Sequence, residues 1–374
     1  MATRVRTQVI DSDAHVEEWA ETFSEKYLDA RYAARRPAIV AAGTRAYWLI
    51  DDRVWPQMVG PGCMIFGTPT GFGHVETKLA KDKPETFASQ ELREGAARLK
   101  DMDREGIDLQ VLYPTLFVGY PLTADPNFYH ALCQSYNNWI ADATRDASGR
   151  LRWVAVCDLG NANLAAAEVH RVKELGAVGV MILGTVGEHQ LYEEEFDPFF
   201  SAMEAAGLPV CVHVGWSCPP LTQMFSSIFE SAMFPFNQPV YMAFASIVAG
   251  GILDRHPRLK IGFFEVGVSW VPYYTERLQH WWSFSQRFPL GYRAKLAPQE
   301  YLRSGNVFFT CEVDERLLPE AIAFVGENQV MFASDIPHAD REEFAARELL
   351  ERGDLSDAVK QKILATNTLR FYNL

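Results

Sequence analysis

Acidic and imidazole side chains stand at the ends of four apolar runs that lie far apart in the sequence. They are Asp13 and His15 in QVIDSDAHVEE, His213 in LPVCVHVGW, Glu265 in LKIGFFEVGVSW, and Asp335 in NQVMFASDIPH. Carboxylate and imidazole are ligands that borderline and hard divalent metals prefer. The pattern therefore predicts a metal-dependent enzyme.

Asp13 and His15 end the first run with a spacing of two residues. If the run is a strand that still alternates at this point, both side chains point the same way and suit joint ligation of one metal. Alternatively, Asp13 caps the following turn and His15 lies on the surface. Asp11 competes for the carboxylate role, or else braces the end of the strand.

His213 and Glu265 interrupt strongly apolar runs. A histidine in such a run is more often a hydrogen-bonded core residue than a ligand, but the other groups favour the ligand interpretation of His213. A buried carboxylate is costly unless it is paired, hydrogen-bonded or metal-bound. Glu265 is thus a candidate metal ligand, general acid/base or substrate partner, with a structural salt bridge as the alternative.

Asp335 and His338 share the segment SDIPH. Asp335 is a candidate metal ligand that also takes a proton from a bound water. His338 is a candidate to orient that ligand or to face the substrate. Ser-Asp before a proline can instead cap a turn.

Eight short apolar runs would carry these residues, and most are separated by helical patterns. The expected strands are 7–11, 109–113, 152–157, 178–182, 209–214, 260–265, 306–310 and 330–334. Strands that alternate with helices and are apolar throughout indicate parallel βα units covered on both faces. The sequence predicts a single α/β domain over 1–374, a (β/α)₈ barrel with its chemistry at the carboxyl ends of the strands.

Helical patterns fill most of the intervals between these strands. They cover 84–105, 126–147, 164–173, 197–206 and 319–325, and 341–374 reads as C-terminal helices. Residues 18–83 are too long for an ordinary βα loop and are interpreted as a lid, with a small hairpin at YWLIDDRVW. A second long connection, 215–238, is rich in Phe, Met, Ser and Pro and would supply an apolar wall.

Five residues outside the strand ends are candidate substrate contacts. They are Arg45 and Arg53, which flank YWLIDD in the lid, His74 in the lid, His189 after the fourth strand, and Trp216 in the second connection. Arginine would bind a substrate carboxylate, and loop aromatics suit a flat, partly apolar substrate. Surface roles for the arginines and ordinary loop packing for the aromatics are the alternatives.

Charge and composition restrict the partners. The formal net charge of −13 argues against nucleic acid and anionic membrane, but a metal or local arginines still allow an anionic small molecule. The six cysteines form no C-x-x-C pair and read as buried reduced thiols. Neither an N-terminal signal pattern nor a bilayer-spanning run is evident, so a cytoplasmic location is expected.

These segments resemble the amidohydrolase superfamily, in the branch related to aminocarboxymuconate-semialdehyde decarboxylase. The matching pieces run from VIDSDAHVEE and GIDLQVLYPT through FDPFFSAMEAAGLPVCVHVG and HPRLKIGFFEVGVSW to VMFASDIPHAD. The resemblance implies a distorted (β/α)₈ barrel with one divalent metal, zinc first and manganese as the alternative. It implies metal ligation by Asp13 and His15 in place of H-x-H, by His213, and by Asp335.

The sixth strand departs from the family pattern, because Glu265 stands where many decarboxylases of the branch carry a histidine acid/base. The resemblance favours non-oxidative decarboxylation of an aromatic or unsaturated carboxylic acid, with Glu265 or His338 delivering the proton. The alternative is hydrolysis of a C–N, C–O or C–C bond by a metal-activated water, with Asp335 as base. A catalytically inactive binding barrel is the third possibility.

The run WVPYYTERLQHWWSFSQRF after the sixth strand is heavily aromatic. Tyr, Trp and Phe are enriched at subunit interfaces. The sequence therefore favours a homodimer that acts on a small molecule.

Overall fold

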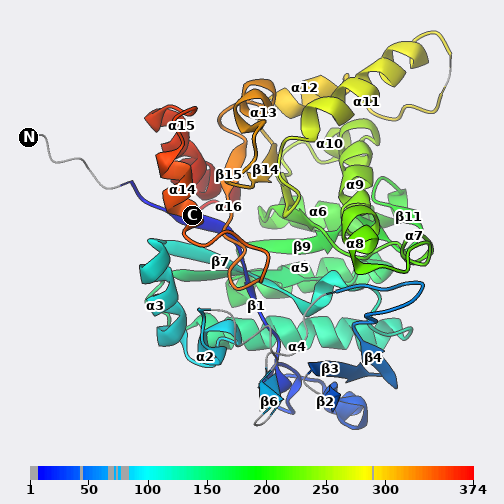
Figure 1. Ribbon diagram of the computed structural model, residues 1–374. Coiled ribbons are helices and arrows are strands. Elements are labelled where there is room, and N and C mark those ends of the chain that lie inside the picture. The colour runs from blue at the N-terminus through cyan, green and yellow to red at the C-terminus, as the bar shows by residue number, and fades with distance from the viewer. Residues whose placement is uncertain (1–6, 43–44, 66–70, 73–74, 77–83, 289) are drawn as a thin grey trace, which may run out of the picture.

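Eight parallel strands form one sheet that curves into a barrel in the computed structural model (Figure 1). The structure describes residues 7–42, 45–65, 71–72, 75–76, 84–288 and 290–374. The strands are β1 (Ile10–Val16), β7 (Leu109–Pro114), β8 (Leu151–Val156), β9 (Gly179–Leu183), β12 (Val210–His213), β13 (Ile261–Phe264), β14 (Val307–Cys311) and β15 (Val330–Phe332). All eight predicted strands are present, and the predicted (β/α)₈ barrel is confirmed.

The strands pair in chain order, and backbone hydrogen bonds close the ring between its first and last members. The amides of Ser334 and Asp335 donate to the Asp13 carbonyl at 3.3 and 3.0 Å, and the His15 amide donates to the carbonyl of Ile336 at 2.6 Å. The last strand therefore delivers Asp335 directly beside the residues that β1 carries.

The first strand differs from its prediction, 7–11, because it begins and ends later. Its pairing with β7 continues to Val16, with a register shift between Asp11 and Ala14. Asp13 and His15 therefore lie inside the strand and not beyond its end. The extra residue of the bulge is a local distortion of the kind that re-aims side chains at barrel rims.

Helices cover the outside of the barrel. They are α3 (Gly95–Glu105), α4 (Pro126–Thr144), α5 (Ala162–Leu175), α6 (Asp197–Ala206), α9 (Gln238–Ala249), α10 (Ile252–Arg255), α11 (Val271–Ser285), α12 (Pro298–Arg303) and α13 (Leu318–Val325). Asn161 caps α5 with its side chain, and Gly176 ends it at φ +99°. The predicted helix 84–105 is broken into α2 (Phe87–Gln90) and α3.

The C-terminal segment forms α14 (Ala345–Glu351), α15 (Asp357–Gln361), a π-helical turn η7 (Lys362–Thr366) and α16 (Asn367–Tyr372). It closes the amino-terminal end of the barrel, because Phe371 packs on Phe264 and Phe308 from two neighbouring strands. The Tyr372 hydroxyl donates to the carbonyl of Ser12 at 2.8 Å and pairs with the Tyr113 hydroxyl at 2.5 Å. The end of the chain thus supports the strand that carries Asp13.

The insertion after β1 contains a three-stranded antiparallel sheet of β2 (Ala38–Ala42), β3 (Arg45–Ile50) and β4 (Arg53–Trp55). The hairpin predicted at YWLIDDRVW is present as β3 and β4. Arg35, just before this sheet, bonds to Asp51 and to Asp125, the residue that caps α4. The insertion is therefore anchored at the carboxyl-terminal side of the barrel.

The connection between β12 and α9 contains α7 (Pro219–Thr222), α8 (Ile228–Ser231) and a π-helical turn η6 (Ala232–Phe236). It contacts the insertion: the Gly62 amide donates to the carbonyl of Phe225 at 3.0 Å, and the Ser231 hydroxyl donates to the carbonyl of Cys63. The two irregular segments that the sequence singles out therefore meet each other above the barrel.

Among the described residues, no helix combines the length and the apolar character that crossing a bilayer requires.

Candidate metal centre

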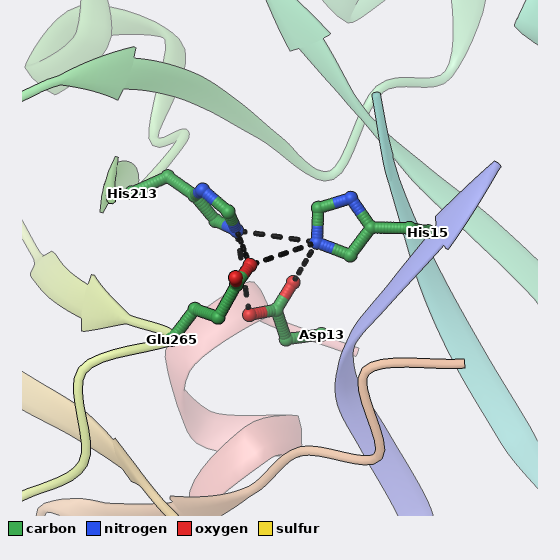
Figure 2. A group of neighbouring side chains, drawn as sticks. All are labelled: Asp13, His15, His213 and Glu265. Carbon is green, nitrogen blue, oxygen red and sulfur yellow. Dashed lines mark hydrogen bonds and ion pairs between the residues drawn. The ribbon is translucent and has the colours of Figure 1, made fainter. Parts of the chain in front are cut away.

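Four side chains converge inside the carboxyl-terminal end of the barrel: two from β1, one from β12, and Glu265 from the position after β13 (Figure 2). The Nε2 atoms of His15 and His213 are 3.2 Å apart, and the Glu265 Oε2 atom lies 3.4 and 3.0 Å from them, respectively. Asp13 completes the group, with Oδ1 at 3.5 Å from His15 Nε2 and Oδ2 at 3.7 Å from His213 Nε2. One ligand atom from each residue lies within 4.8 Å of all the others.

Backbone carbonyls orient both imidazoles. The Nδ1 atom of His15 lies 3.0 Å from the carbonyl oxygen of Pro114, and the Nδ1 atom of His213 lies 3.0 Å from that of Val214. A carbonyl accepts only, so each Nδ1 carries a hydrogen and each ring turns its Nε2 toward the carboxylates. This is the arrangement in which histidine binds a metal through Nε2.

The carboxylates of the group are buried without conventional hydrogen-bond donors. Among the described residues, no donor other than the two imidazoles reaches either oxygen of Asp13 or the Oε2 of Glu265, and Asp13, His15 and His213 are fully buried. Unpaired buried carboxylates are strongly unfavourable unless a positive charge compensates them. The two imidazole nitrogens and the carboxylate oxygens therefore fit a divalent cation.

The electrostatics of the group indicate the same need for positive charge. Burial by itself lowers the pKa of His15, but hydrogen bonds to Asp13 and Glu265 outweigh it and raise the pKa well above its ordinary value. Burial likewise opposes the charged form of Glu265, yet the charge of His213 and the contact with His15 hold its pKa far below its usual range. A bound cation would take the place of the protons that the imidazoles otherwise attract.

Asp335 and His338 lie beside the group on its more open side. Asp335 Oδ1 is 3.6 Å from His15 Nε2 and 2.6 Å from His338 Nδ1, and both side chains are 16% exposed. His15, Glu265, Asp335 and His338 form a second set of ligand atoms within 4.8 Å. Burial and the charge of Glu265 raise the pKa of Asp335 well above its ordinary value.

The two carboxylates that follow strands sit on unusual backbone. Glu265 has φ +57° and Asp335 has φ +54°, the left-handed region that side chains with a Cβ rarely adopt. Such conformations persist only where the surroundings hold them, and they concentrate at functional sites. At both residues the backbone leaves its strand and turns at the rim of the barrel.

Asp11, the alternative to Asp13 as a carboxylate ligand, instead has a structural role at the end of the barrel. Its carboxylate accepts hydrogen bonds from the amide of Ser334 at 2.9 Å, the hydroxyl of Ser334 at 2.5 Å and the Gln110 amide group at 2.8 Å. Burial raises its pKa to about 6 despite these bonds. Asp11 therefore ties β1 to the segment after β15, and the cluster takes Asp13 instead.

The candidate substrate contacts are dispersed. His189 is 59% exposed on β11 (His189–Gln190) and pairs with Glu193 and Glu195, apart from the cluster. Trp216 is buried, and its indole nitrogen donates to the Ser231 hydroxyl at 2.7 Å, so it supports the wall between the two irregular segments.

The guanidinium of Arg53 stacks on Trp55 at 4.7 Å within its own strand. Arg45 begins β3, and His74 lies outside the described residues.

Two further residues of this region were not singled out by the sequence. Thr115, after β7, has its Oγ1 3.1 Å from His338 Nε2. Glu312 directly follows β14 and is exposed at the rim, yet crowding by protein atoms and the charges of Asp335 and Glu265 raise its pKa to about 8. A signal for Glu312 was available, because it follows the run VFFTC as Glu265 follows IGFF.

A parallel barrel with an imidazole–carboxylate cluster at the carboxyl ends of its strands defines a class of metal-dependent enzymes. Comparison with known proteins identifies the class: residues 10–374 match the profile of the amidohydrolase family Amidohydro_2. The chain belongs to this family, and the resemblance drawn from its sequence is confirmed.

Characterised relatives share about a quarter of their residues with this chain. A 2-amino-3-carboxymuconate-6-semialdehyde decarboxylase from Dictyostelium discoideum is 25% identical over 280 residues, covering 74% of this chain and 76% of the relative. A gamma-resorcylate decarboxylase from Rhizobium sp. is 25% identical over 294 residues, covering 74% and 86%. Both relatives belong to the branch that the sequence indicates.

Solved structures agree with the fold. An amidohydrolase from Mycobacterium avium subsp. paratuberculosis superposes with a TM-score of 0.79 at 23% identity and covers 99% of both chains. A 5-carboxyvanillate decarboxylase from Novosphingobium aromaticivorans, complexed with manganese and 4-hydroxy-3-methoxy-5-nitrobenzoic acid, gives a TM-score of 0.68 at 25% identity. It covers 80% of this chain and 84% of its own.

Proposed function

We propose that this protein is a metal-dependent, non-oxidative decarboxylase of an aromatic carboxylic acid. The observation that carries the proposal is the contact between Asp335 and His338, 2.6 Å apart, beside the imidazole–carboxylate cluster. Decarboxylation of an aryl acid needs a proton source next to a cationic anchor for the carboxylate, and this arrangement supplies both. The names of the relatives support the same reaction class.

Asp13, His15, His213 and Glu265 are the proposed cation ligands, with Asp335 at the edge of the set. When bound, the cation would anchor the substrate carboxylate with a neighbouring oxygen and draw electron density from them. Nitrogen and oxygen donors accommodate both zinc and manganese. The manganese in the solved 5-carboxyvanillate decarboxylase favours manganese over the zinc that the sequence suggests first.

The hydrogen bonds around His338 assign a proton to its pair with Asp335. The Thr115 hydroxyl donates to the carbonyl of Val16 at 2.8 Å, so its oxygen is left to accept from His338 Nε2–H. His338 Nδ1 then faces Asp335 Oδ1 at 2.6 Å, and a proton must lie between them. The pair is a proton store at the open side of the cluster.

In the proposed reaction this proton adds to the ring carbon that bears the carboxylate. The bond between that carbon and the carboxylate then breaks, its electron pair returns to the ring, and CO₂ leaves. The balance is one carboxylate and one proton in, one arene and one CO₂ out. Glu265 would act as a ligand, so the departure from histidine at the sixth strand would change the cation's surroundings and leave proton delivery to Asp335 and His338.

The test is a panel of hydroxybenzoates, heteroaromatic acids and muconate-type acids, incubated with manganese- or zinc-loaded protein in water enriched in ¹⁸O. Release of CO₂ without ¹⁸O in the organic product supports decarboxylation. Incorporation of ¹⁸O into a new carboxylate or alcohol would instead support hydrolysis by a metal-activated water. Protein that retains neither metal would support an inactive binding barrel.

We further propose that residues 18–83 form a lid and that Arg45 or Arg53 meets the substrate carboxylate when it closes. The anchoring of the insertion at Asp125 on the carboxyl-terminal side supports this.

A cytoplasmic location is supported by six cysteines that form no disulfide.

We also propose a homodimer through α11. This helix extends away from the barrel (Figure 1), and Tyr273, Trp281 and Phe284 on it are 65%, 53% and 41% exposed. Light scattering should give twice the chain mass for the wild type and a shift to monomer for Trp281→Glu. Leu175→Glu, at an exposed apolar position on α5, is the control that should leave the mass unchanged.

A further inference from the structure

One carboxylate joins the loops that follow the sixth and seventh barrel strands. The side chain of Glu315 accepts hydrogen bonds from the amides of Val268 at 3.0 Å and Ser269 at 2.7 Å, which follow β13. It also accepts from the amide of Glu312 at 2.9 Å, the first residue after β14. Carboxylate bonds to backbone amides are charge-assisted and stronger than neutral ones.

The loop that Glu315 holds begins with Glu265, whose backbone is left-handed. Two residues later Gly267 is also left-handed, at φ +63°, and a Cβ there would stand 2.9 Å from the Glu315 carboxyl carbon. The amide of Glu265 donates to the buried Thr310 Oγ1 at 3.1 Å. The unusual turn is thus held before it by Thr310 and after it by Glu315.

Glu315 is itself fixed from the C-terminal part of the chain. Arg352, which follows α14, donates through Nη1 to the carbonyl of Glu315 at 2.9 Å and to that of Val313 at 2.7 Å. The seventh-strand loop is therefore held on both sides. A rigid loop of this kind can transmit its position to the sixth-strand loop through the Glu315 carboxylate.

We propose that Glu315 is a positioning residue for the metal centre. Its carboxylate holds the loop after β13 in the conformation that turns Glu265 toward Asp13, His15 and His213. Glu315 touches neither substrate nor cation and acts through Glu265. The inference rests on the proposed metal centre, though not on which reaction the centre performs.

The experiment measures manganese binding to metal-free protein by equilibrium dialysis, with the free ion followed by its EPR signal. Glu315→Gln keeps the shape but presents an NH₂ group to backbone N–H donors, so the loop should lose its anchor. We expect the manganese Kd to rise about 10- to 100-fold, the range seen when groups that orient metal ligands are removed. At saturating manganese, kcat should return to within a few-fold of wild type.

The matched control is Glu300→Gln. Glu300 also accepts a backbone hydrogen bond, from the amide of Ala297 at 2.9 Å, but at the start of α12. Both variants should lower the melting temperature slightly, whereas only Glu315→Gln should weaken manganese binding. A purely structural role for Glu315 would give the two variants the same manganese Kd.

Gly267→Ala provides an independent approach, because its new methyl group would displace the Glu315 carboxylate. It should weaken manganese binding as Glu315→Gln does. Folded Glu315→Gln and Gly267→Ala proteins with wild-type manganese affinity would overturn the inference while leaving the proposed function intact. Wild-type protein that binds no divalent metal would overturn both.

Discussion

The deep and the open sides of the metal centre are built differently. Asp13, His15 and His213 lie within β1 and β12, are fully buried, and take their places from the ladder of the barrel. Glu265 and Asp335 come after their strands, are 15% and 16% exposed, and stand on left-handed backbone held by loops. Under the proposed function, the rigid strands would supply three of the cation ligands, and the rim would supply the fourth ligand, Glu265, together with the proton chemistry of Asp335.

Removing a deep ligand should have the largest effect. His213→Ala takes one imidazole from the cluster, so metal affinity should fall by more than about 100-fold and turnover should be lost with it. Metal content after dialysis measures the effect. His256→Ala removes another buried histidine, which contacts Asp197, and should retain wild-type metal content. Equal metal content in the two variants would contradict the assignment of cation binding to the buried strand residues.

Changing a rim residue should lower the rate of the chemical step without a comparable loss of metal affinity. Asp335→Asn keeps the size of the side chain but cannot deliver or take up the proton, so kcat should fall by about 10²- to 10⁴-fold. Manganese affinity should remain within about 10-fold of wild type, because the strand ligands stay in place. Single-turnover kinetics at saturating metal measure this. A variant with wild-type kcat would refute the assignment of Asp335.

A smaller change tests the proton store. Thr115→Val preserves the shape but removes the acceptor for His338 Nε2–H, so kcat should fall about 2- to 10-fold and its pH profile should move. Thr144→Val is the matched control, since that buried hydroxyl donates to the carbonyls of Ile140 and Ala141 within α4. An unchanged pH profile in Thr115→Val would show that the threonine does not set the proton position.

The last prediction concerns the stability of the fold, not turnover, and a rim carboxylate whose pKa is raised by burial. Asp158 lies two residues beyond β8, and burial raises its pKa to about 6 from 3.8. The folded state therefore binds this proton more tightly than the unfolded state, and stability falls as pH rises from about 4 through 6.

Asp158→Asn should thus stabilise the protein by up to about 3 kcal/mol at pH 8 and have little effect at pH 4. Chemical denaturation at both pH values measures this. A gain at pH 4 that equals the gain at pH 8 would show that titration of Asp158 is not the cause.

The sequence predicts the deep side better than the rim. Periodicity locates the strands, and a parallel barrel brings their carboxyl ends together, so the convergence of Asp13, His15 and His213 follows from local patterns. The bulge in β1 that selects Asp13 over Asp11 depends on the register with β7, which no local pattern reveals.

The rim depends on contacts between distant loops. The left-handed turn of Glu265 is held by Thr310 and Glu315, and the orientation of His338 by Thr115, 223 positions away. The candidate substrate contacts that were chosen by residue type alone, such as His189, do not gather at the cluster. Their positions depend on the path of the loops that carry them, which residue type does not reveal.

The support beneath the centre has a consequence for how the protein is made. Tyr372, which bonds to the carbonyl of Ser12, is synthesised 360 positions after that residue. A nascent chain cannot complete this support of the proposed metal centre until α16 has been synthesised. Stalled or clipped molecules that lack α16 should therefore retain less metal than molecules that contain it.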